Sequence, residues 1–132
     1  MSAEFLSDEW HAMVVQVGAD SPKVVTPDTR FRFKIEKGPN GTQNFVWVLG
    51  GGTLLTSEMA PRGYKPDIAV TMKYPILVDV VNGELSFSVG YMRGDVKLEG
   101  DPGAVVRLVP ELDRDEWAEL LSEIWAQTSL PT

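Results

Sequence analysis

The chain has no cysteine and only one histidine among its 132 residues. Without cysteine there is no disulfide, no thiol nucleophile and no cysteine ligand for a metal. The lone His11 has no partner in a His-x-x-x-His pair, so neither a zinc site nor a catalytic triad can be assembled around it. We therefore expect no catalytic residue, no metal and no cofactor, and we expect His11 at a solvated or edge position.

Long hydrophobic runs and dense basic clusters are also missing. The longest apolar stretches, 45–49 and 75–78, are far shorter than the roughly 18 residues that a membrane span needs. The formal net charge is −7, and the most basic stretch, 30–34, only alternates Arg and Lys with apolar residues. The N-terminus lacks the pattern of a secretory signal. We expect a cytoplasmic protein with no nucleic-acid partner and no membrane span.

What is present fits one domain over residues 1–132, long enough to bury about two-thirds of its surface. Ser7 is a suitable N-cap for a first helix with apolar residues at helical spacing, and alternating apolar residues then predict strands. The expected elements are a helix over 8–18 and strands over 30–36, 45–49 and 53–59. Three glycines at 50–52 lead into a strand and not a helix, so we expect a backbone bend there and no phosphate-binding loop.

The stretch from Pro66 to Leu112 changes period several times. Alternation predicts a strand over 68–73, and apolar residues at helical spacing between Pro75 and Gly83 predict a short helix. Residues 84–92 match both a strand and a short helix, and periodicity alone leaves both open.

After that stretch the pattern is clearer. A strand over 94–100 precedes a helix that Asp101 caps and Pro110 ends. Asp113 and Glu116 form a capping-box-like pair at the start of the last helix, and residues 129–132 should fray. Together the elements predict an α+β fold, with a five-stranded mixed sheet covered on one face by helices.

Five short motifs follow one another in the second half of the chain. They are Pro-Asp-Ile-Ala-Val-Thr-Met at 66–72, Asn-Gly-Glu-Leu at 82–85, Tyr-Met-x-Gly at 91–94, Val-x-Leu at 96–98 and Gly-Asp-x-Gly at 100–103. In this order they resemble the lipid-binding domain of the type-2 sterol carrier protein family. The resemblance implies a sterol-carrier-like fold, in which residues such as 85–91 form a second short helix.

The resemblance also implies a function: non-catalytic binding or transfer of a fatty acid, acyl-CoA, sterol or similar lipid in a tunnel between sheet and helices. Each buried methylene contributes roughly 0.8 kcal/mol, so a long chain needs no charged anchor. A pocket of about 300 Å³ or more would fit this role. The expected lining residues are Phe33, Trp47, Met72, Ile76, Leu77, Val80, Leu85, Phe87, Met92, Leu108, Leu121 and Ile124.

Two features depart from the family pattern. Many members have a helix-rich segment between the first helix and the first strand, which is reduced here to 18–29. This predicts a shallower tunnel, or one closed by a second subunit in a homodimer. The C-terminal Ser-Leu-Pro-Thr also differs from the Ser-Lys-Leu-like address of peroxisomal members.

Other interpretations compete with the carrier. Apolar helix stripes are first of all core, and the sequence alone does not show that this core is hollow. A small enzyme acting on an apolar substrate would use Asp67, Asp95 or Tyr91, although no spacing demands a catalytic pair. An interaction module would present an exposed Trp125 to a second copy or a partner enzyme.

Overall fold

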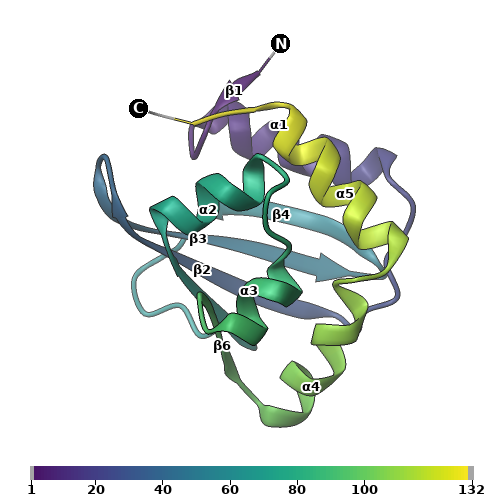
Figure 1. The fold of residues 1–132 in the computed structure, drawn as a ribbon. Helices are drawn as coiled ribbons and strands as arrows, with labels where there is room; N and C mark the ends of the chain where they lie inside the picture. The colour runs from purple at the N-terminus through teal and green to yellow at the C-terminus, as the bar shows by residue number, and fades with distance from the viewer. Residues whose placement is uncertain (1, 131–132) are drawn as a thin grey trace.

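The computed structural model describes residues 2–130 and confirms the α+β fold (Figure 1). Five strands form a mixed sheet in the order β4-β3-β2-β5-β6, in which β2 and β5 are parallel and the other neighbours antiparallel. The elements are β1 (Ala3–Glu4), α1 (Asp8–Asp20), β2 (Thr29–Gly38), β3 (Gly41–Gly50), β4 (Thr53–Met59), β5 (Ile68–Lys73), α2 (Tyr74–Val81), α3 (Phe87–Arg93), β6 (Val96–Gly100), α4 (Pro102–Glu111), α5 (Asp115–Ala126) and β7 (Thr128–Ser129).

The face of the sheet that the helices cover is rich in aromatic rings. Phe33 on β2 lies opposite Phe45 on β3, and their rings stack with centroids 4.8 Å apart. Trp10 of α1 packs edge-on against Phe45, and Trp117 of α5 packs edge-on against Phe31. The core is therefore one layer of apolar side chains between the sheet and the helices.

The other face of the sheet carries the polar residues of β2 and is crossed by the loop from β4 to β5, residues 60–67. This loop runs behind the sheet in Figure 1, on the side away from the helices. Its ends are held by backbone hydrogen bonds from Ala60 to Asn44 and from Asp67 to Arg30. The loop thereby carries the chain past β3 and β2 so that β5 can pair in parallel with β2.

The structure resolves the ambiguous stretch at 84–92 as the helix α3. Ser86 caps it by accepting a hydrogen bond from the backbone N–H of Val89 at 3.2 Å, and Gly94 ends it at φ +83°. A side chain at Gly90 would lie 2.7 Å from Val96, so glycine lets α3 pack directly on β6.

Two expected helix boundaries were wrong. Helix α4 does not end at Pro110 but continues to Glu111, because a proline one residue before the helix end removes only one backbone bond. Helix α5 begins at Asp115 with Arg114 as its N-cap, and makes no side-chain capping bond. Asp113 instead accepts a hydrogen bond from the hydroxyl of Ser88, so its carboxylate is used between helices and not at a helix start.

Ser129 does not fray, contrary to expectation. Ala3 and Glu4 of β1 pair in parallel with Thr128 and Ser129 of β7 in a separate two-stranded sheet. Two-residue strands are too short to show any alternation, which is why the sequence gives no sign of them. Residues 131–132, also expected to fray, lie outside the described part of the chain.

His11 is buried, with 8% of its surface exposed, so the expected solvated position is wrong, while the alternative of an edge position fits its place against the edge strand β4. Helix α1 packs along β4, and the Nδ1 of His11 lies 2.6 Å from the hydroxyl oxygen of Ser57. The same oxygen accepts a hydrogen bond from the indole of Trp47 at 3.1 Å. Burial lowers the pKa of His11, against the opposing charges of Asp8 and Glu58.

Candidate functional site

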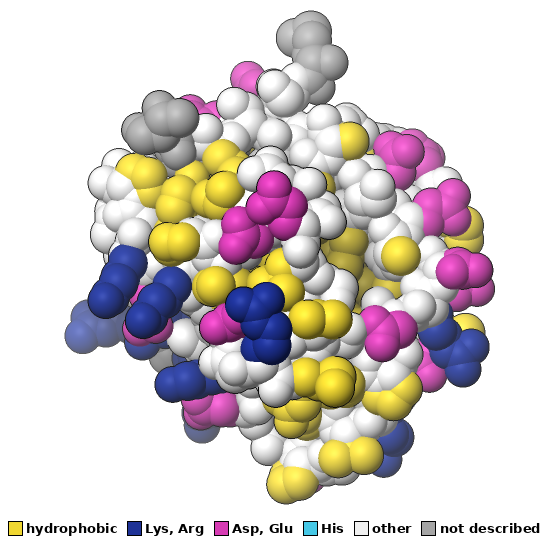
Figure 2. Space-filling model, viewed as in Figure 1, with side chains coloured by type: hydrophobic (Ala, Val, Ile, Leu, Met, Phe, Trp, Pro, Cys, Tyr) yellow, Lys and Arg dark blue, Asp and Glu magenta, His cyan; other side chains and the backbone are white. Residues whose placement is uncertain are grey.

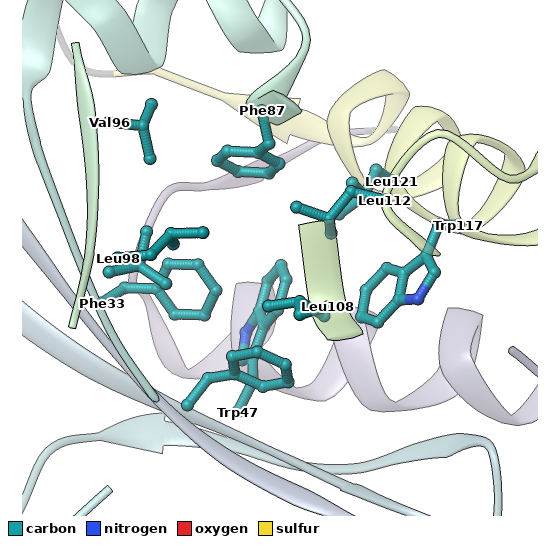
Figure 3. Close-up of a pocket in the computed structure, with 11 residues that line it drawn as sticks. Phe33, Trp47, Phe87, Val96, Leu98, Leu108, Leu112, Trp117 and Leu121 are labelled. Carbon is teal, nitrogen blue, oxygen red and sulfur yellow. The ribbon is translucent and has the colours of Figure 1, made fainter. Parts of the chain in front are cut away.

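A small apolar cavity of about 30 Å³ lies between the sheet and helices α3, α4 and α5 (Figure 3). It has room for one or two water molecules, but its wall offers no polar group to hold them. Even the indole nitrogens are engaged elsewhere, since Trp47 donates to Ser57 and Trp117 to Thr26. The lining residues are Phe31, Phe33, Trp47, Val70, Phe87, Val96, Leu98, Leu108, Leu112, Trp117 and Leu121.

A larger cleft of about 480 Å³ opens beside this cavity, between α5 and the segment that joins α2 to α3. Figure 2 shows the surface hollowed there, with hydrophobic side chains at the bottom of the hollow. Its polar lining groups, Asn82, Ser86 and Ser122, are all uncharged. The other lining residues are Val80, Val81, Gly83, Leu85, Phe87, Leu112, Ala118, Leu121, Trp125 and Ala126.

Three side chains line both the cavity and the cleft: Phe87, Leu112 and Leu121. They come from three different segments, namely the start of α3, the residue after α4 and the middle of α5. Figure 3 shows them along one side of the cavity. We call these three residues the dividing wall, because they line both the cavity and the cleft.

A hydrogen bond between side chains ties two of the segments that carry the dividing wall. The Ser88 hydroxyl donates to a carboxylate oxygen of Asp113 at 2.5 Å. Ser88 directly follows Phe87, and Asp113 directly follows Leu112. The Ser88–Asp113 bond therefore fixes α3 to the loop between α4 and α5, and with it two side chains of the wall.

The twelve residues expected to line a tunnel fall into three groups. Phe33, Trp47, Phe87, Leu108 and Leu121 line the cavity, and Val80 and Leu85 join Phe87 and Leu121 in lining the cleft. The others line neither space: Met72, Leu77 and Ile124 are buried in the core, Ile76 is half-buried against it, and Met92 is 80% exposed on α3. That the twelve contact a ligand stays a prediction.

Six cavity residues were not among those twelve. Phe31 and Val70 alternate with Phe33 and Met72 along their strands, so the strand period could have identified them. Val96, Leu98 and Trp117 belong to apolar patterns that indicate core without indicating a cavity. Leu112 follows a proline that was expected to end the helix, and nothing in the sequence marks it.

The side chains expected to act in an enzyme, Asp67, Asp95 and Tyr91, line neither the cavity nor the cleft, whereas Trp125, expected to serve an interaction module, lines the cleft. Asp67 is paired with Arg30, whose backbone N–H donates to it at 2.9 Å and so lowers the pKa of that carboxyl. Asp95 lies 2.9 Å from Arg93. Trp125 was expected to be exposed but is 9% exposed, because its ring packs on Trp47 and lines the cleft.

Residues 2–130 contain no group of three or more His, Asp or Glu side chains placed to hold a metal ion. Over the same residues, none of the helices has the length and apolar character needed to cross a membrane.

The fold and the apolar layer together define an α+β protein of the sterol-carrier type. The family model described as the SCP-2 sterol transfer family matches residues 18–113. The chain therefore belongs to that family.

Solved structures share the fold at low sequence identity. The solution structure of the conserved hypothetical protein TT1886 from Thermus thermophilus is 16% identical with a TM-score of 0.75, over 100% of this chain and 96% of that one. A crystal structure of sterol carrier protein 2 is 14% identical with a TM-score of 0.73, over 95% and 99%. The solution structure of palmitated SCP2L2 from Aedes aegypti is 19% identical with a TM-score of 0.58, over 88% and 98%. No curated protein matches the chain.

Proposed function

We propose that residues 1–132 form one non-catalytic domain that binds or transfers an apolar ligand such as a fatty acid, acyl-CoA or sterol. The observation that carries the proposal is the apolar cavity between sheet and helices, which shares the lining residues Phe87, Leu112 and Leu121 with an open cleft. Family membership supports the same ligand class, and the Aedes aegypti relative is described as palmitated. We place this function in the cytoplasm.

The cavity is too small for a lipid chain, so binding requires the dividing wall to move. With about 30 Å³ available, the tunnel implied by the family resemblance is not open in this structure. If the wall side chains swing outward, the cavity joins the cleft of about 480 Å³, which lies within the range of small-molecule sites. Ligand burial would supply the free energy, at roughly 0.8 kcal/mol for each methylene.

The uncharged polar groups that line the cleft favour some ligand head groups over others. Asn82, Ser86 and Ser122 can donate or accept hydrogen bonds, but no charged side chain lines the cleft. A hydroxyl is satisfied by such groups, whereas a carboxylate loses part of its hydration in the cleft and finds no cationic partner there in return. We infer that a long-chain alcohol binds more tightly than the carboxylic acid of equal length at neutral pH, by several-fold. Competition of the two against one fluorescent probe measures the difference.

The direct test is to purify the protein, extract it with organic solvent and identify any lipid by mass spectrometry. Delipidated protein is then titrated with a fluorescent fatty acid, and the probe is displaced with unlabelled lipid. We expect saturable uptake near one equivalent and displacement by long chains only. If no lipid is extracted and no probe is taken up, the carrier proposal is wrong.

A further inference from the structure

The face of the sheet away from the helices holds a further pocket, of about 300 Å³, between β2, β3 and the β4–β5 loop. Its lining includes two arginines, one from β2 and one from the loop, together with an amide and a phenol. The full set is Arg32, Asn44, Ala60, Pro61, Arg62, Gly63 and Tyr64. This pocket shares no residue with the cavity or the cleft.

The arginine on β2 differs from its two basic neighbours on the same face. Arg30 is paired with Asp67 at 3.4 Å, and Lys34 lies 4.0 Å from Glu36. Arg32 stands between them with no ion pair or hydrogen bond of its side chain within residues 2–130, and its Nε is buried without an acceptor. Its cross-strand neighbours on β3 and β5 are Val46 and Ala69, which offer no carboxylate.

The second arginine is presented by a tight turn. The backbone N–H of Tyr64 donates to the carbonyl of Pro61 at 3.2 Å, and Gly63 takes φ +77°, the conformation that the third residue of a type II turn requires. Arg62 thus lies at the corner of the turn, is exposed, and forms no ion pair among the described residues.

The pocket thus holds two arginines without carboxylate partners, and Arg32 is the one with a buried, unpaired guanidinium N–H. A buried guanidinium N–H without an acceptor costs free energy until an acceptor arrives. Arginine forks bind phosphate and carboxylate groups through paired hydrogen bonds, and two forks on one pocket suit such an anion. Burial raises the pKa of Tyr64, so its phenol stays protonated at neutral pH and remains a donor.

We propose that this pocket binds a small organic anion, with Arg32 and Arg62 holding its phosphate or carboxylate group. The volume exceeds what a bare phosphate fills, and the ring of Tyr64 and the side chain of Pro61 offer an apolar surface for an organic body. Glu58 lies near Tyr64, whose pKa its charge helps to raise, and its carboxylate opposes an anion there. The site is separate from lipid binding, since it lies on the opposite face of the sheet.

The test is a titration of the full chain, at low salt, with phenyl phosphate, benzoate and the uncharged benzyl alcohol. Backbone amide NMR shifts of Asn44, Gly63 and Tyr64 report binding. We expect saturable shifts for the two anions, with dissociation constants on the order of 1 mM, and none for the alcohol. Added salt weakens the binding. Absence of saturable shifts for both anions would overturn the proposal.

Substitutions in and beside the pocket test whether the two arginines themselves hold the anion. R32Q and R62Q should each weaken phenyl phosphate binding about tenfold, because each loses a charged fork. K34Q is the matched control, since it removes one positive charge from the same strand and face but lies outside the pocket, and it should weaken binding less than twofold. R32K keeps the charge, and should weaken binding nearly as much as R32Q if the fork matters. E58Q should tighten it.

R62Q changes an exposed turn residue and should not disturb folding. It therefore tests the site even if R32Q fails to fold. Equal effects of R62Q and K34Q would show general electrostatics in place of a site. Lipid uptake should be unchanged in all of these variants.

Discussion

Under α1 the inner face of the sheet meets a solid block of aromatic rings, whereas under α3, α4 and α5 the same face borders the cavity. On the α1 side Trp10 is 0% exposed, packs edge-on against Phe5 and Phe45, and donates to Thr128 at 2.9 Å. On the other side the dividing wall comes from three segments, with the Ser88–Asp113 bond tying α3 to the loop after α4. Rings that pack on one another and are fixed by a hydrogen bond have one good position, while the dividing wall, Phe87, Leu112 and Leu121, has no polar end to fix its side chains.

This difference indicates that the α1 side supplies stability and the α3–α5 side supplies adaptability. The largest expected contrast is in unfolding free energy. Trp10→Ala should lower it by about 3–5 kcal/mol, because it leaves a large void in rigid surroundings and removes the partner of Thr128. Phe87→Ala should cost less than about 2 kcal/mol, because the half-buried ring already borders open space. Urea denaturation measures both, and equal losses would contradict the comparison.

The next effect is on ligand uptake. Leu98→Phe places a larger side chain into the cavity from the edge strand β6, and should lower uptake of a fluorescent fatty acid about tenfold, which corresponds to about 1.4 kcal/mol. Its effect on unfolding should stay within about 1–3 kcal/mol. Val89→Phe adds similar bulk to an exposed position on α3 and serves as the control. Unchanged uptake by Leu98→Phe would show that ligand does not enter this cavity.

A smaller effect should follow from breaking the Ser88–Asp113 bond. Ser88→Ala frees α3 from the loop after α4, so the wall moves more easily and bound probe should dissociate several-fold faster. The stability cost should be about 1 kcal/mol. Thr42→Ala removes an exposed hydroxyl on β3 that lines neither the cavity nor the cleft, and should leave the dissociation rate unchanged. Stopped-flow displacement of probe provides the rates, and equal rates for both variants would rule out a holding role for the bond.

The smallest expected effect is the pH dependence from His11. Its pKa in the folded protein is lowered by burial, so below about pH 6.5, the ordinary histidine value, the unfolded chain takes up a proton before the folded chain does. Its contribution to stability is therefore complete above that pH and is lost as the pH falls toward the lowered folded-state pKa. His11→Gln should remove this loss, as measured by thermal unfolding between pH 8 and 5. An identical profile in the variant would contradict the assignment.

Most of the fold could be predicted because it depends on local patterns. The alternation along β2 placed Phe33 on the inner face, and Ser7, Pro75 and Gly83 marked helix ends as expected. For residues 84–92 the spacing of apolar residues did not distinguish a helix from a strand, because a seven-residue helix shows only two turns of its pattern. There the family resemblance, and not the periodicity, predicted a helix.

The site could be predicted less well, because it depends on contacts between distant residues. Asp113 looked like a helix cap from its neighbours, yet its partner is Ser88, 25 residues away. The volume of a cavity depends on how side chains from several elements meet, which no single stretch encodes. The dividing wall is such a case, since Phe87, Leu112 and Leu121 share no local pattern.

The short pairing of β1 with β7 has a consequence for rearranging the chain. Ala3 lies beside Thr128, so the first and last strands are neighbours in space. A linker of a few glycines and serines should connect them, and new ends can then be opened in the turn at 61–64. In such a permuted chain the elements would be synthesised in a different order but should reach the same fold. The new ends would interrupt the arginine pocket and leave the apolar cavity intact.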